Sequence, residues 1–226
     1  MSAAEPFARL NEYQDTILFP MVRDKRFREL CDRILELLAT EHDPDCRFAL
    51  ITDLTTFLRY AGDDQESLRW AQSLTQEYAD NPFAWTNLAG WYFYSPHPGS
   101  PSNKDRGRAL EYFETALKIA RQQNEFVRSV LFAICRVLTD MADYAALSEY
   151  MNEILLDMNI QREYDIPQFE ADWLNRVPAG AIAPDLRETF IRLEAADSKR
   201  RQSNRFSTMA PTRSDLERGE GEGESE

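Results

Sequence analysis

Apolar residues recur at spacings of three and four along the chain from Phe7 to Leu193, and no stretch shows the alternation of a half-buried strand. One such stripe consists of Phe27, Leu30, Cys31, Ile34, Leu37 and Leu38. The positions between them are largely charged, so this segment has one face to bury and one to expose. The pattern predicts an all-α protein.

Short breaks separate the expected helices, and each contains Gly, Pro, Asn or Asp. They lie at residues 41–44, 61–64, 79–82, 122–125 and 141–143. Helices of about 14 to 18 residues joined by such short links must run antiparallel to their neighbours. We therefore expect stacked helical hairpins.

Each turn that opens a second helix is followed by an equivalent apolar or small position. These positions are Leu30, Ser67, Ala109 and Leu147, which lie 37, 42 and 38 residues apart. Periods of this size are typical of helical repeats. The clearest copy reads WTNLAGWY and then RALEYFETALKIA, in which small Ala89, Ala109 and Ala116 let two helices approach closely.

These motifs resemble the tetratricopeptide repeat (TPR) over about residues 14–158, as four imperfect units. The resemblance implies a right-handed solenoid of helical hairpins, in which the first helix of each hairpin lines a concave groove that receives a peptide or partner helix. The first unit departs most from the pattern, because Pro20 interrupts its opening helix. The expected domains are four hairpins over 1–158, capping helices over 159–201 and a disordered acidic tail over 202–226.

The resemblance also implies which side chains contact a partner: Thr52, Thr56, Arg59, Asn87, Phe93, Phe132 and Arg136. Asp53 and Gly90 also face the expected groove. The arginines suit carboxylates or backbone carbonyls, and the phenylalanines suit apolar anchors; packing between hairpins is the alternative for each. The Lys and Asn set that clamps chaperone tails in this family is absent apart from Asn87, which disfavours a chaperone-tail adaptor.

Beyond the repeats, a short helix is expected to begin at Pro167 and a final helix to run from Pro184 to about Arg201, capping the last hairpin. The Pro-rich segment 96–104 is an insertion, interpreted as a tolerated surface loop or as a lip over the groove.

The charge and cysteine content limit the function classes. The 226 residues include 39 acidic and 26 basic side chains, a net charge of −13, which disfavours nucleic-acid binding. No window approaches the roughly 18 apolar residues of a membrane span, and the N-terminus lacks a signal sequence. Three cysteines without a CxxC spacing fit a reducing compartment. A cytoplasmic location is therefore expected.

Candidate chemistry is sparse. The segment EHDPDC, residues 41–46, holds several potential metal ligands, but it flanks a proline turn with no second cluster. An N-cap at Asp43 or Asp45 is the simpler interpretation. Cys31 and Cys135 lie on apolar helix faces and read as core residues. The run 199–205, KRRQSNR, is read as a cationic last helical turn rather than a nucleic-acid patch.

No catalytic residue, metal or cofactor is therefore expected. The sequence predicts a non-catalytic adaptor, scaffold or chaperone-like module with a protein or peptide partner, whose identity the sequence does not give. One alternative is self-association through the aromatic run Trp91–Tyr94, which would produce a homodimer. Another is a small carboxylate or metal-dependent enzyme.

Overall fold

The computed structural model describes residues 4–94, 105–160 and 171–208, and within these ranges every regular element is a helix. The hairpin helices are α1 (Ala4–Tyr13), η1 (Gln14–Leu18), α2 (Phe19–Arg23), α3 (Phe27–Leu38), α4 (Pro44–Tyr60), α5 (Asp64–Glu77), α6 (Pro82–Phe93), α7 (Arg106–Gln123), α8 (Val127–Met141) and α9 (Tyr144–Ile160). They are followed by η2 (Asp172–Arg176) and α10 (Pro184–Thr208). The all-α prediction is confirmed.

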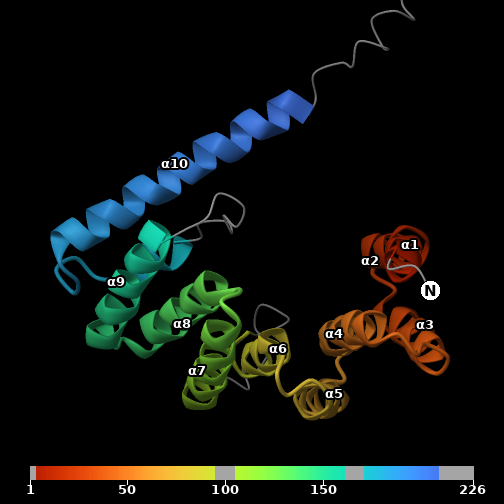
Figure 1. Cartoon of the computed structure of the whole chain (residues 1–226). Coiled ribbons are helices and arrows are strands. Elements are labelled where there is room, and N and C mark those ends of the chain that lie inside the picture. The colour runs from red at the N-terminus through yellow and green to blue at the C-terminus, as the bar shows by residue number, and fades with distance from the viewer. Residues whose placement is uncertain (1–3, 95–104, 161–170, 209–226) are drawn as a thin grey trace, which may run out of the picture.

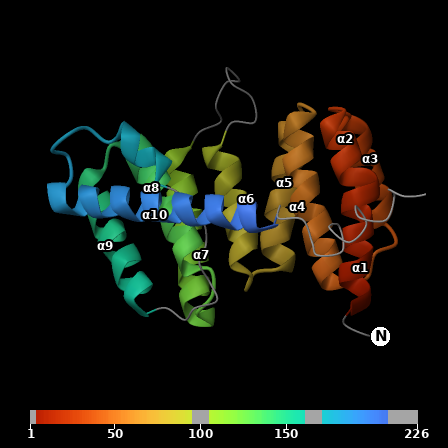
Figure 2. The ribbon, with the colours of Figure 1, turned by 90° about the horizontal axis from the view of Figure 1, so that it is seen from above.

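The hairpins stack into an arc. Figure 1 shows α4, α6 and α8 on its inner, concave side and α3, α5, α7 and α9 on its outer side. Viewed from above in Figure 2, α10 crosses α9, α8, α7 and α6, so this last helix passes over the concave side of the C-terminal hairpins.

The repeat register predicted from the sequence matches the core. Leu30, Ser67, Ala109 and Leu147 are all fully buried. Because a buried hydroxyl needs a partner, Ser67 donates a hydrogen bond to the carbonyl oxygen of Thr55 at 2.6 Å. The 37, 42 and 38 residue spacings therefore mark structurally equivalent positions.

Two apolar clusters form the core. The first joins α3, α4 and the N-terminal helices, and the second extends from α5 and α6 to α10. In the second cluster Ala89, Ala109 and Ala116 are fully buried, and Phe113 fills the space beside them. Small residues thus sit where α6 and α7 approach each other, as the clearest repeat predicted.

The first hairpin is irregular at the point where Pro20 stands. Its opening helix is divided into α1, the π-helix η1 and α2, and the N–H of Phe19 donates to the carbonyl oxygen of Gln14. A proline has no N–H and its ring crowds the preceding turn, so the chain widens into a π-turn there. The next hairpin begins regularly, since Asp43 caps α4 by accepting from the backbone N–H groups of Asp45 and Cys46 at 3.1 and 3.0 Å.

The C-terminal segment differs from its prediction. The final helix α10 extends to Thr208 instead of ending at about Arg201, so 202–208 are helical and the predicted tail begins too early. Between α9 and α10, the described part of the expected short helix is the 3-10 helix η2. Pro167, the 96–104 insertion and residues 209–226 lie outside the described residues. None of the helices in the described ranges is long and apolar enough to cross a bilayer.

Ala109 tests the register directly. Ala109→Leu adds bulk at a fully buried α6–α7 contact and should lower the free energy of unfolding by about 1 to 3 kcal/mol. Ala145→Leu, at an exposed position of α9, is the matched control and should change it by less than about 0.5 kcal/mol. Denaturant titration followed by circular dichroism measures both, and equal midpoints for the two variants would show that α6 and α7 do not meet at Ala109.

Candidate functional site

The inner helices α4 and α6 enclose a pocket of about 270 Å³ on the concave side. Its lining residues are Thr55, Thr56, Arg59, Tyr60, Thr86, Asn87, Gly90, Trp91 and Tyr94. Three residues predicted for partner contact, Thr56, Arg59 and Asn87, are therefore brought together. Tyr60 and Tyr94 are 40% and 43% exposed, so two aromatic rings remain open to solvent beside the pocket.

Arg59 is the charged group of this pocket. Its guanidinium lies over the Trp91 ring, 5.7 Å from the ring centroid, and its Nη2 donates to the carbonyl oxygen of Tyr94. Its Nε is buried without an acceptor, and within the described ranges no carboxylate lies within ion-pair distance of it. Burial lowers the pKa of Arg59, an effect opposed by Asp64. The guanidinium thus contacts a ring and a carbonyl oxygen, and Asp64 acts on it from beyond ion-pair distance.

Further nitrogen donors line the same pocket. The indole Nε1 of Trp91 is buried and lacks an acceptor among the described residues. Asn87 lies in the same wall, where its Oδ1 is 3.1 Å from the Thr55 hydroxyl, whose single proton is shared with the carbonyl oxygen of Thr52. A buried donor without a partner costs about 1 to 3 kcal/mol. This group of donors suits a carboxylate or carbonyl oxygen supplied from outside.

Gly90 keeps the pocket open on the α6 side. A Cβ at this position would touch only the Tyr94 ring, at 3.5 Å, so a methyl group is tolerated while a larger side chain would enter the pocket. Thr52 does not line the pocket. Its carbonyl oxygen accepts from the hydroxyls of Thr55 and Thr56 at 2.8 and 3.1 Å. Thr52 therefore supports two lining residues.

The predicted aromatic anchors are buried instead. Phe93 and Phe132 are each 4% exposed and belong to the second apolar cluster, which extends from α5 and α6 to α10. The prediction that they form exposed anchors is therefore wrong. Trp91 and Tyr92 are buried as well, and only Tyr94 of that run is exposed. These rings pack among α6, α7, α8 and the segment around η2, which covers the inner face of the last hairpin.

Arg136 is engaged within the chain. Its Nη2 lies 3.2 Å from Oδ1 of Asp172 in η2, and Arg176 of η2 pairs in turn with Asp140 of α8. The same segment buries Trp173 and Leu174 against the cluster. The protein's own chain thus covers the inner face of α8, and Arg136 is not a free partner contact as predicted. The α4–α6 pocket lies outside this covered region.

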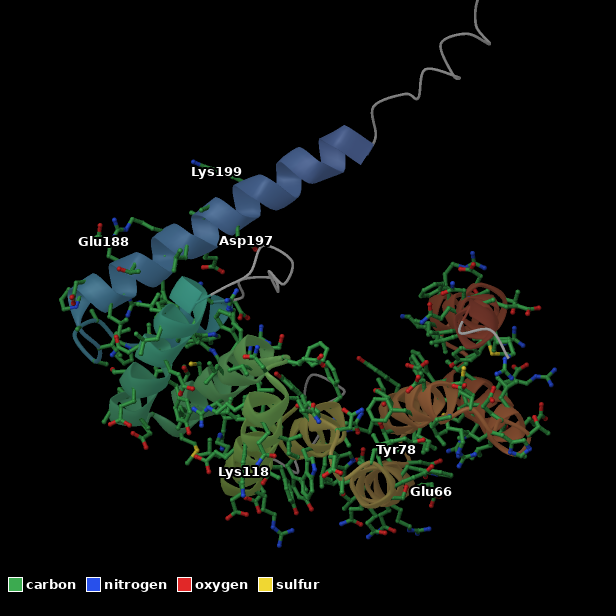
Figure 3. All side chains as sticks on the ribbon, in the orientation of Figure 1. Glu66, Tyr78, Lys118, Glu188, Asp197 and Lys199 are labelled. Carbon is green, nitrogen blue, oxygen red and sulfur yellow. The ribbon has the colours of Figure 1, made fainter. Side chains whose placement is uncertain are left out.

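Two charged side chains of α10 point to opposite sides of the helix. Figure 3 shows Lys199 on the side of α10 that faces away from the arc, whereas Asp197 lies on the side toward it. Asp197 is 8% exposed.

The other candidate chemistry is structural. Cys31, Cys46 and Cys135 are free and buried, and burial raises the pKa of Cys31 to about 11, so its thiol stays protonated at neutral pH. In the described parts of the chain, no three His, Cys, Asp or Glu side chains converge as a metal site would need. His42 is exposed beside the Asp43 cap.

Asp53 is a half-buried carboxylate beside the groove, and its contact with α1 could not be predicted from periodicity. The Tyr13 hydroxyl of α1 donates to its Oδ2 at 3.2 Å. Burial raises the pKa of Asp53 to about 6, although the hydrogen bond from Tyr13 opposes this. An unfolded aspartate has a pKa of about 3.9.

The stability of the protein should therefore depend on pH through Asp53. From about pH 4 to 6 the folded state retains a proton that the unfolded state loses, so the free energy of unfolding falls as pH rises, by up to about 3 kcal/mol. Asp53→Asn keeps an acceptor for Tyr13 and carries no charge. Denaturation across pH 4 to 8 should show the variant more stable than wild type at pH 7 and similar at pH 4. A constant difference at every pH would contradict this.

Comparison with solved structures agrees with the architecture. A putative kinesin light chain from Podosopora anserina with nearly identical TPR-like repeats superposes with a TM-score of 0.55 at 13% identity, covering 87% of this chain and 98% of that one. A variant of that protein gives 0.57 at 13% identity, with coverage of 90% and 99%. BtubC (BKLC) from P. vanneervenii gives 0.54 at 14% identity, with coverage of 85% and 79%.

No protein-family model and no curated protein matches the sequence. At 13 to 14% identity the structural likeness establishes the fold. The chain is a TPR-like helical repeat protein, as its repeat spacing predicted.

Proposed function

We propose that this protein is a non-catalytic interaction module, an adaptor or scaffold, that binds a peptide or helical segment of a partner protein against α4 and α6. The TPR-like fold is one that suggests protein partners. The observation that carries the proposal is the Arg59 guanidinium, which lines the pocket with no carboxylate of the described residues within ion-pair distance. The partner would supply an acidic side chain or a carbonyl oxygen to it.

Electrostatics make this recognition selective. The protein carries a net charge of −13, so its overall field repels an acidic segment at long range. At short range a partly buried guanidinium interacts strongly with a carboxylate, because little water screens the pair. An acidic segment would therefore gain affinity at this pocket and little elsewhere on the surface. Added salt should weaken the long-range repulsion and speed association.

The rim of the pocket supplies the apolar part of the contact. Tyr60 and Tyr94 are exposed, and amphipathic rings of this kind commonly anchor interfaces. Tyr60 is itself held by Phe27, with ring centroids 5.1 Å apart. A ring already ordered by packing loses little conformational freedom on binding. The three buried thiols fit the reducing cytoplasm as the site of action.

The role of Arg59 in binding is tested by comparing its substitution with the same substitution at a control arginine outside the pocket. Peptides selected from a random display library on the wild-type protein should be enriched in Asp and Glu. Arg59→Gln should weaken their binding at least tenfold, about 1.4 kcal/mol, because it removes the charge. Arg69→Gln, at an exposed position on α5 that pairs with Glu66, should leave affinity unchanged. Isothermal titration calorimetry gives the constants, and circular dichroism confirms that both variants fold.

Two results would contradict the proposal. Selected peptides that bind Arg59→Gln as tightly as wild type would show that the α4–α6 pocket is not the recognition site. A library that yields no acidic enrichment would show that the guanidinium does not select the ligand.

A further inference from the structure

A second pocket, of about 380 Å³, lies between the first hairpin and α4, away from the α4–α6 site. Its apolar walls are Leu10 and Tyr13 of α1, Ile17 of η1, Leu37 of α3 and Leu50 of α4. Tyr13 and Leu50 are buried and the other three are half-buried. The lining also includes Arg9, Glu12, Thr16, Thr40 and Glu41. Small-molecule sites typically combine this size with apolar walls and a few polar groups.

The pocket sits where the repeat is irregular. Thr16 and Ile17 of its wall belong to the π-helix η1, which precedes Pro20. A wider helical turn spaces its side chains differently from those of an α-helix, and single π-turns are frequent at functional sites. An unfilled volume of this kind weakens packing, so an occupant would stabilise the hairpin.

Most polar side chains around this pocket have partners within the chain, and Glu12, which also lines it, is exposed to solvent. The Arg9 guanidinium lies 3.2 Å from the Glu41 carboxylate, which also accepts from the backbone N–H groups of His42 and Asp43 at 2.9 and 2.8 Å. The hydroxyls of Thr16 and Thr40 donate to main-chain oxygens of Glu12 and Leu37.

None of the buried unpaired polar atoms found in the described residues belongs to this pocket, in contrast to the Arg59 pocket. The part of a ligand that contacts the apolar walls therefore needs no charge and no hydrogen-bonding group. Apolar wall surface of this kind gains free energy when an apolar occupant removes it from water.

We propose that the first hairpin binds a small, uncharged apolar molecule between α1, η1, α3 and α4, independently of the partner site. The ligand class is an aromatic or aliphatic compound without an ionised head group. Binding joins the irregular opening helix to α3 and α4, so the occupied protein is more stable than the empty one.

The probe is N-phenyl-1-naphthylamine, an uncharged dye whose fluorescence rises in apolar surroundings. Full-length wild type should give saturable binding with one site per chain. Ile17→Phe and Leu37→Phe enlarge two wall residues and should each weaken binding at least tenfold. Leu35→Phe, at a position of α3 that is 40% exposed and outside the pocket, is the matched control. It should bind the dye as wild type does.

A second measurement, on wild type and the control, tests the proposal even if Ile17→Phe or Leu37→Phe folds poorly. Saturating benzene should raise the melting temperature of wild type and of Leu35→Phe, and should compete with the dye. Dye binding that is not saturable, or that survives both filling substitutions in folded protein, would overturn the proposal. Tighter binding of an anionic naphthalene sulfonate, lost in Arg9→Ala, would show that the ligand class is wrong.

Discussion

A helical hairpin buries its apolar face only against the next hairpin, so an open stack leaves one face uncovered at each end. This constraint governs the protein. At the C-terminal end the exposed face of the last hairpin is covered by η2 and the start of α10, which bury Trp173 and Phe190 with ring centroids 6.1 Å apart. The N-terminal end lacks such a cover among the described residues, and its opening helix is distorted at Pro20.

The unequal ends determine which part of the concave side can take part in recognition. Around α8 the ion-pairing groups come from the protein's own η2 segment: Asp172 pairs with Arg136, and Arg176 pairs with Asp140. The rings of Phe93 and Phe132 are part of the apolar core there. Between α4 and α6 no such segment has been found in the described ranges, and a pocket with unpaired donors remains. The two pockets therefore differ in chemistry. The α4–α6 pocket contains buried donors that have no acceptor among the described residues, whereas none of the buried unpaired polar atoms of those residues lies in the pocket of the N-terminal helices.

The parts of the fold predicted from the sequence are those set by local pattern. The helix breaks, the Asp43 cap and the buried register at Leu30, Ser67, Ala109 and Leu147 follow from periodicity and residue size. The cover of α8 could not be predicted in this way, because Arg136 and Asp172 are 36 residues apart and η2 has no repeat signal. Likewise, the helix position of Arg59 predicts that it faces the groove. The absence of a carboxylate of the described residues within ion-pair distance of it depends on how the helices assemble, so the sequence pattern could not predict it. Residues 202–208 carry no apolar stripe, so the sequence pattern could not predict that α10 continues beyond Arg201.

The most direct test of this account is whether the segment around η2 is part of the core. Trp173 is fully buried, so Trp173→Ala should lower the free energy of unfolding by about 3 to 5 kcal/mol while unfolding stays a single transition in denaturant. Intrinsic fluorescence and far-ultraviolet circular dichroism should report the same lowered midpoint. An unchanged midpoint, or a separate early transition in which the C-terminal segment detaches from intact hairpins, would show that η2 and α10 are an appendage rather than the cover on which the C-terminal half depends.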